Sequence, residues 1–169
     1  SHIQSNSNLL PKTDEEFLIE TNYEVNEYRF GSYEAIIRNV YLTEDKNTFE
    51  DIHICKSGQR VFLKILILAK RDFSSVIIGV SFKNVHGMIL WGDSSLKGLN
   101  FPLKLVKGKN IITFEFNLNL MEESYLLYAG LADVSQKERV ELDQRWPLKK
   151  IAVFNIRSMA EGLIYSPAV

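Results

Sequence analysis

The stretch Ile112-Thr113-Phe114-Glu115-Phe116-Asn117-Leu118 carries the clearest structural signal in the chain. Its even-numbered residues are apolar and its odd-numbered residues are polar, which is the period of a β-strand with one buried face. Ile78-Gly79-Val80-Ser81-Phe82-Lys83 follows the same rule. Both stretches therefore predict strands that lie with one face on a hydrophobic core.

Short apolar runs recur from Tyr23 onward and are separated by turn-forming segments. The predicted strands are 34–42, 48–54, 60–69, 76–84, 88–91, 110–118, 124–134 and 151–156. Gly or Asn occurs in the separators 56–58, 84–87 and 107–110, where a tight turn needs a positive φ. The pattern predicts an all-β domain, a sandwich of two antiparallel sheets of immunoglobulin-like or jelly-roll type.

Two parts of the chain do not follow this strand pattern. Residues 1–22 are rich in Ser and Asn, and we interpret them as a linker that begins with a cloning remnant at Ser1-His2. The chain would then be an excised fragment whose sandwich domain covers residues 23–169. The charged segment Ser135–Arg145, followed by Pro147, predicts a long loop with at most one helical turn.

The run from Val61 to Leu68 is apolar on both faces except at Lys64. The residues Val61, Leu63, Ile65 and Ile67 form its expected core face. A second apolar face, formed by Phe62, Leu66 and Leu68, has two interpretations. It forms a subunit interface or receives a swapped strand, or else it belongs to a central strand that is covered by loops of the same chain.

Composition excludes several classes of protein. The chain has 169 residues and a net charge of −1, without the basic excess that phosphate contacts require, so nucleic-acid binding is not expected. One cysteine, Cys55, cannot form an internal disulfide, and no Cys/His spacing for a metal site is present. No apolar run reaches the length of a membrane span, and we expect no cofactor.

Motifs for catalysis are absent from the sequence. It contains no P-loop, no Gly-x-Ser-x-Gly elbow and no dinucleotide fingerprint. His86 beside Gly87 has the features of a turn residue. The acidic residues between Asp133 and Asp143 are typical of a solvated surface, although a sugar-cleaving jelly roll would need two facing acids. We therefore predict a binding module, with no catalytic residue.

An ordered series of turn-and-strand motifs resembles a known family. The motifs are YRFGSYEAII at 28–37, SGQ at 57–59, IGVSFKN at 78–84, HGMILWGDS at 86–94, VKG at 106–108, YLLYAGLAD at 125–133 and VFNI at 153–156. Their order is similar to the C-terminal carbohydrate-binding domain of Wzt proteins, the ATPase subunits of O-antigen polysaccharide exporters. The usual Gly-x-Asn-Thr stretch reads Trp91-Gly92-Asp93-Ser94 here, and the segment Val134 to Lys149 is unusually charged.

The resemblance implies a function and a cellular setting. It implies a sandwich that forms homodimers, in known cases by exchange of a C-terminal strand. It also implies recognition of the modified non-reducing end of a lipid-linked polysaccharide, in the cytoplasm at the inner face of the bacterial inner membrane. The implied partners are an ATP-binding cassette domain in the same chain and a transmembrane permease.

Aromatic rings and cations on strands are the candidate glycan contacts, because a sugar offers an apolar ring face and a rim of hydroxyls. The candidates are Tyr28, Phe30, Arg38, Asn39, Lys64, Lys83, Trp91 and Tyr128. We expect the three cations among them to project from one sheet face, and Tyr128 to share the face of Lys83.

Each candidate also has a structural interpretation. The lysines can serve to discourage aggregation at sheet edges, and Trp91 can belong to the core. Tyr28 and Phe30 can staple the first strand, and Trp146 is expected to anchor the charged loop. Two other functions stay open as alternatives: a dimerisation module, and a jelly-roll enzyme that acts on sugars.

Overall fold

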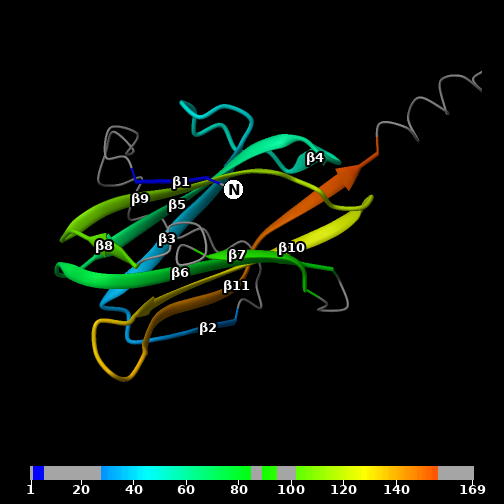
Figure 1. Ribbon diagram of the computed structural model, residues 1–169. Helices are drawn as coiled ribbons and strands as arrows, with labels where there is room; N and C mark the ends of the chain where they lie inside the picture. The colour runs from blue at the N-terminus through cyan, green and yellow to red at the C-terminus, as the bar shows by residue number, and fades with distance from the viewer. Residues whose placement is uncertain (1, 6–27, 85–88, 95–101, 156–169) are drawn as a thin grey trace, which may run out of the picture.

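The computed structural model describes residues 2–5, 28–84, 89–94 and 102–155, and every regular element in these ranges is a strand (Figure 1). The strands are β1 (His2–Ser5), β2 (Tyr28–Phe30), β3 (Ala35–Thr43), β4 (Ile54–Lys56), β5 (Arg60–Ala69), β6 (Phe73–Lys83), β7 (Ile89–Ser94), β8 (Leu103–Leu105), β9 (Gly108–Asn117), β10 (Glu123–Asp133) and β11 (Val140–Phe154). Within the described residues, no helix has the length and apolar character needed to cross a membrane.

The strands form two sheets that pack face to face. Sheet A has the order β1-β9-β5-β3, and sheet B has the order β2-β11-β10-β6-β7, with β4 added to β11 and β8 added to β6. Neighbouring strands run antiparallel except β4 and β11, which pair in parallel. The prediction of an all-β, two-sheet antiparallel sandwich is confirmed, with this one parallel pair as the exception.

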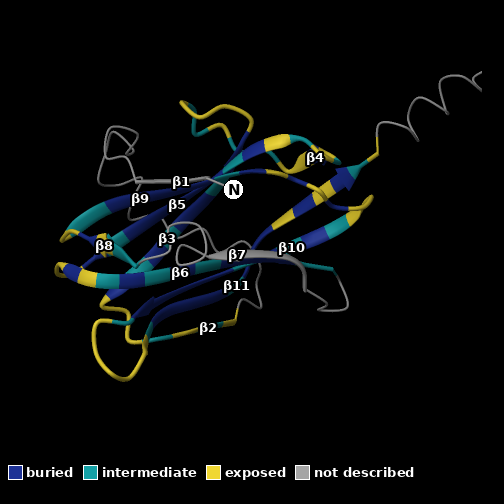
Figure 2. Cartoon of the chain, in the orientation of Figure 1, coloured by how far each residue is buried: buried dark blue, intermediate teal, exposed yellow. Residues whose placement is uncertain are grey.

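Period-two alternation places the core between the sheets (Figure 2). On β9, Ile112, Phe114 and Phe116 face inward and are buried against the inward residues of β6 and β10. The opposite face of this strand is only partly open, since Thr113 is buried as well. Alternation on the two clearest stretches thus predicted the core residues correctly, but it did not predict how well the outer face of sheet A is covered.

The run in β5 shows what covers that outer face. Its core face is buried as predicted, and Leu66 on the other face is buried together with Ile111 of β9. Tyr41, Phe49 and Leu68 pack on this pair. Because Phe49 belongs to the connection between β3 and β4, the interpretation of a central strand covered by its own chain holds for Leu66.

Three local predictions are corrected by the structure. The segment 48–54, predicted as a strand, is irregular up to Ile54. The segment Ser135–Arg145, predicted as a loop, is a short connection followed by the first part of β11, because β11 pairs with β10 on both sides of Pro147. Residues 2–5 of the predicted linker form β1 on the edge of β9, and residues 6–22 lie outside the described ranges.

Candidate functional site

The outer face of sheet B gathers aromatic rings around one lysine. Lys83 ends β6, and its Nζ atom lies 4.9 Å from the centroid of the Tyr128 ring and 5.6 Å from that of Trp146. Tyr128 is on β10 and Trp146 is on β11, so three neighbouring strands contribute one residue each. The prediction that Tyr128 shares a face with Lys83 is confirmed by the ring contact.

β2 extends this group at the edge of the sheet. Tyr28 pairs with Trp146, and Phe30 pairs with Gln144. Alternation directs both rings of β2 outward, where Tyr28 is 69% exposed and Phe30 is 49% exposed. The two rings pack edge to face with centroids 6.3 Å apart. We call the set Tyr28, Phe30, Lys83, Tyr128 and Trp146 the aromatic face.

A chain of hydrogen bonds orients Tyr128. Its hydroxyl donates to Oε1 of Gln144, and Nε2 of Gln144 donates to Oε2 of Glu141, which also accepts from Arg139. Gly130 makes room for this arrangement, because a Cβ atom there would overlap the Gln144 side chain. Burial, reinforced by the negative charge of Glu141, raises the pKa of Tyr128, so its hydroxyl stays protonated and donates.

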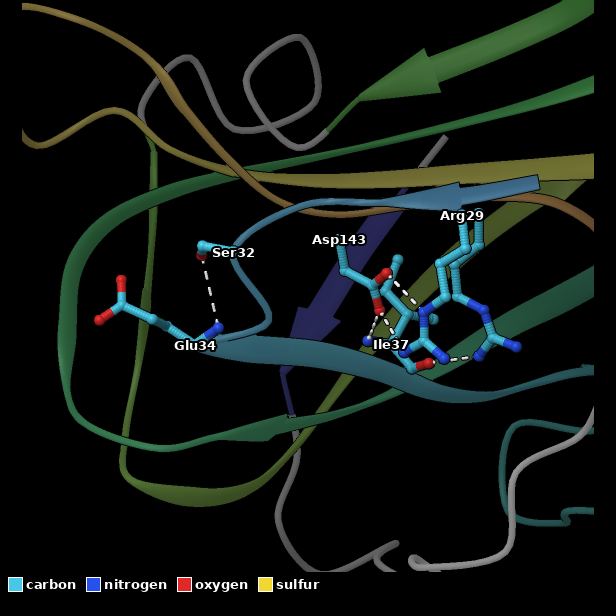
Figure 3. Close-up of polar contacts among 6 residues, drawn as sticks. Arg29, Ser32, Glu34, Ile37 and Asp143 are labelled. Atoms are coloured by element: carbon cyan, nitrogen blue, oxygen red, sulfur yellow. Dashed lines mark hydrogen bonds and ion pairs between the residues drawn. The ribbon is translucent and has the colours of Figure 1, made fainter.

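A buried ion pair connects β2 with both sheets (Figure 3). Arg29, the inward residue of β2, donates from Nε and NH2 to the two carboxylate oxygens of Asp143, each at 2.9 Å. Oδ2 of Asp143 also accepts from the backbone N–H of Ile37 on β3, at 2.7 Å. The carbonyl oxygen of Ile37 accepts from Arg145. These bonds satisfy the backbone N–H and carbonyl groups of Ile37 on the edge strand β3, and they explain why two charged residues of β11 are buried.

Three candidates lie on sheet A instead. Arg38 and Asn39 are on β3, and Lys64 is on β5. The expectation that Arg38, Lys64 and Lys83 project from one sheet face is therefore wrong, because β5 and β3 belong to the other layer of the sandwich. Asn39 is buried and donates from Nδ2 to the hydroxyl of Tyr41 at 3.1 Å.

Lys64 is closed off from solvent. Its side chain is fully buried, Nζ donates to the carbonyl oxygen of Thr48, and the ammonium group lies 4.8 Å from the centroid of the Phe49 ring. Burial lowers the pKa of Lys64, and the charge of Asp45 opposes this effect. Lys64 thus fastens the connection between β3 and β4 onto sheet A.

Trp91 remains a prediction. It lies on β7, and its backbone is paired with Phe82 of β6. Its side chain lies outside the described part of the structure. Residues 91–94 form the second part of β7, which pairs with β6.

Sequence reasoning missed Trp146 as a member of the aromatic face. The sequence predicted that Trp146 anchors a charged loop, but it is a strand residue whose ring packs near Lys83. A signal was present, because Gln144 and Trp146 alternate with the charged residues Asp143 and Arg145. Asp143 and Arg145 hid that signal, since charged residues rarely occupy the buried face of a strand.

A second polar cluster lies beside β4. Lys149 is buried, and its Nζ contacts Oδ2 of Asp51 at 2.7 Å and Nδ1 of His53 at 3.1 Å. Burial lowers the pKa of Lys149, while the hydrogen bond from Lys149 to Asp51 acts in the opposite direction. Burial also raises the pKa of the Cys55 thiol to about 11. Among the described residues, no group of three His, Cys, Asp or Glu side chains is arranged to hold a metal ion.

Two of the acids considered for a hydrolase, Asp133 and Asp143, make contacts within the sandwich. Asp143 is fully buried against Arg29. Asp133 accepts from the backbone N–H of Ser135 at 2.9 Å and from Arg71 at 3.4 Å. These two side chains stabilise the sandwich and do not form a facing pair in a cleft.

An all-strand sandwich with outward aromatic rings around an ammonium group is an architecture typical of β-sandwich binding domains. The family is given by a comparison with known protein families. The model of the Wzt C-terminal domain matches residues 26–165, and the chain belongs to this family. It is accordingly a carbohydrate-binding domain of the kind found in ABC exporters.

A solved structure of the Wzt C-terminal domain supports the same fold. A crystal structure of the C-terminal domain of Wzt matches with a TM-score of 0.69 and 22% identity, over 80% of this chain and 86% of that chain. The CARDB domain of a Pyrococcus furiosus protein, solved with two metal ions, matches with a TM-score of 0.40 and 14% identity, over 69% of this chain and 86% of that chain. No curated protein matches the sequence.

Proposed function

We propose that this domain recognises the modified non-reducing end of a lipid-linked O-antigen polysaccharide during export by an ABC transporter, without turning it over. The aromatic face is the observation that carries the proposal. It places two exposed rings, two half-buried rings and one ammonium group on the outer surface of sheet B.

The chemistry of this face suits a sugar. Tyr28 and Phe30 offer exposed ring surface for the apolar face of a pyranose ring, at a low cost in side-chain entropy. Lys83 forms no ion pair with an acidic residue within the described part of the chain. Its ammonium hydrogens can therefore bond to hydroxyl oxygens or to an anionic substituent of the ligand.

The wider setting is part of the same proposal. The polysaccharide would be presented in the cytoplasm at the inner face of the bacterial inner membrane. An ATP-binding cassette domain in the same chain and a transmembrane permease would complete the exporter, and the domain would act as a homodimer. Each of these points is an expectation from the resemblance of the sequence to Wzt proteins. Light scattering at micromolar protein concentration tests the dimer, and a monomer there would contradict it.

A glycan array tests the proposed ligand. The array carries O-antigen polysaccharides whose non-reducing ends are unmodified, methylated or phosphorylated, and calorimetry follows on the glycans that bind. We expect binding to a modified end, with at least about tenfold weaker binding to its unmodified counterpart, equal to about 1.4 kcal/mol. If the domain binds none of these polysaccharides, the proposal is refuted.

Matched variants assign the binding to the aromatic face. Tyr28→Ala removes an exposed ring of the face, and Met121→Ala removes an exposed apolar side chain outside it. We expect Tyr28→Ala to weaken binding by about tenfold, because rings at recognition sites commonly contribute more than 1 kcal/mol. Met121→Ala should bind like the unaltered protein. Equal losses in both variants would place the site elsewhere.

A further inference from the structure

The short edge strand β2 carries two rings of the aromatic face. It is a strand of three residues at the edge of sheet B, and among the described strands it pairs only with β11. Its two rings are the most exposed rings of the aromatic face. Short edge strands open easily, because few backbone hydrogen bonds hold them. Tyr28 and Phe30 can serve as a preformed surface only if something else fixes this strand.

The C-terminal end of β2 is fixed by the backbone. The N–H of Ser32 donates to the carbonyl oxygen of Glu141 at 3.0 Å, and the N–H of Tyr33 donates to that of Leu142 at 2.9 Å. Gly31 passes so close to the Leu142 carbonyl group that no Cβ would fit, and its φ of 149° is one that L side chains rarely adopt. The chain therefore leaves β2 by a defined path.

The middle of β2 is fixed by Arg29. Its guanidinium group makes two parallel bonds to Asp143, whose carboxylate is fully buried, and it also lies 5.3 Å from the centroid of the Tyr33 ring. A planar fork on a carboxylate sets direction as well as distance. Because Asp143 is also bonded to the Ile37 N–H of sheet A, the fork is anchored to a group that both sheets hold (Figure 3).

We propose that Arg29 is a positioning residue for ligand binding: its fork on Asp143 holds β2 in place, and thereby sets Tyr28 and Phe30 on the aromatic face. Arg29 itself points into the sandwich, so it acts through the rings on either side of it. This claim about ligand binding rests on the proposed function, whereas the claim about the order of β2 does not.

Hydrogen exchange of the intact domain tests the structural part. In Arg29→Lys the charge is kept and the fork is lost. We expect the amides of residues 28–30 to exchange at least about tenfold faster, while the amides of β6 and β10 keep their rates. Unchanged exchange in β2 would overturn the proposal. Arg71→Lys is the control, because Arg71 also forms an ion pair with an acidic residue, Asp133. The loss of this ion pair should leave hydrogen exchange in β2 unchanged.

A second variant covers the case in which Arg29→Lys is too unstable. Removing one partner of a buried pair leaves an uncompensated charge, whereas Arg29→Gln with Asp143→Asn removes both charges together. We expect this double variant to fold and to show the same fast exchange in residues 28–30. Native protection of β2 in the double variant would overturn the proposal.

A double-mutant cycle tests the functional part with the methylated, phosphorylated and unmodified polysaccharides of the array. We expect Arg29→Lys to weaken binding about tenfold in the unaltered protein, but less than twofold when Tyr28→Ala and Phe30→Ala are already present. Equal losses in the two backgrounds would show that Arg29 does not act through the rings. If the unaltered protein binds none of these glycans, the proposed function fails, and the exchange data still decide whether Arg29 orders β2.

Discussion

The Nζ atom of Lys83 lies 4.9 Å from the centroid of the Tyr128 ring, so a cation from β6 rests on an aromatic ring from β10. Contact with a ring stabilises an ammonium group by about 0.5–1 kcal/mol at exposed sites. The Tyr128 ring therefore holds Lys83 in place, and its ammonium group can still donate hydrogen bonds to a ligand.

Lys83→Met should weaken polysaccharide binding about tenfold, since a hydrogen bond to a charged group contributes about 1.5–3 kcal/mol. The loss should be largest for ends that carry a negative charge, and it should shrink as salt is added. Calorimetry at two salt concentrations measures both effects. Lys64→Met, on the other sheet, is the control and should bind normally. A comparable loss from Lys64→Met would contradict the assignment of the face.

Gly130→Ala should lower the free energy of unfolding by about 1–3 kcal/mol, because the new Cβ overlaps the Gln144 side chain. Denaturation with urea measures the change. Adding Gln144→Ala removes the overlapping group, so the double variant should recover part of the loss. If the double variant is less stable than Gly130→Ala alone, the overlap is not the cause.

Acid should remove a stabilisation that centres on Asp133. Burial opposes ionisation of this carboxyl group, but hydrogen bonds from Ser135 and Arg71 outweigh burial and lower its pKa below the ordinary value of 3.8. A carboxyl group whose pKa is lower in the folded state stabilises the fold at all pH values above its unfolded pKa. That stabilisation is lost as the pH falls through the lowered pKa.

Asp133→Asn should therefore lower the free energy of unfolding by about 1 kcal/mol at neutral pH. Between about pH 5 and pH 2, the free energy of unfolding should fall less in this variant than in the unaltered protein. Urea denaturation across this range provides the measurement. Glu122→Gln, at an exposed position, is the control. Parallel pH profiles for Asp133→Asn and the unaltered protein would show that Asp133 does not contribute in this way.

Cys55 should be inert in the folded domain. Its side chain is fully buried, and burial raises the pKa of the thiol to about 11, so little thiolate exists at pH 8. A disulfide reagent such as Ellman's reagent should react with Cys55 only after the domain is unfolded. Rapid reaction without denaturant would mean that β4 opens readily from β11.

Period-two patterning predicted much of the fold. The inward residues of β5, β6 and β9 were predicted correctly, since burial of one face imposes a period of two whatever the rest of the chain does. The first half of β11 escaped prediction, because Asp143 and Arg145 occupy inward positions that normally carry apolar residues. Their charges are tolerated only through partners that are far away in sequence, at Arg29 and Ile37.

The sequence predicted only some members of the candidate site correctly. Tyr28, Phe30, Lys83 and Tyr128 were predicted and lie together, whereas Asn39 and Lys64 are buried on sheet A. An aromatic ring or a cation on a strand is visible in a sequence. The sheet to which its strand belongs is not visible, because that depends on pairings between residues dozens of positions apart.

By itself, the sequence determined that this chain is a two-sheet sandwich and which side chains of its regular strands turn inward, because alternation is a local property of an extended backbone. Only the tertiary structure decided that β2, β11, β10 and β6 lie side by side and bring Tyr28, Trp146, Tyr128 and Lys83 to one surface. Strand order depends on long-range hydrogen bonds and on buried pairs such as Arg29 and Asp143, whose energy is gained only when distant segments meet.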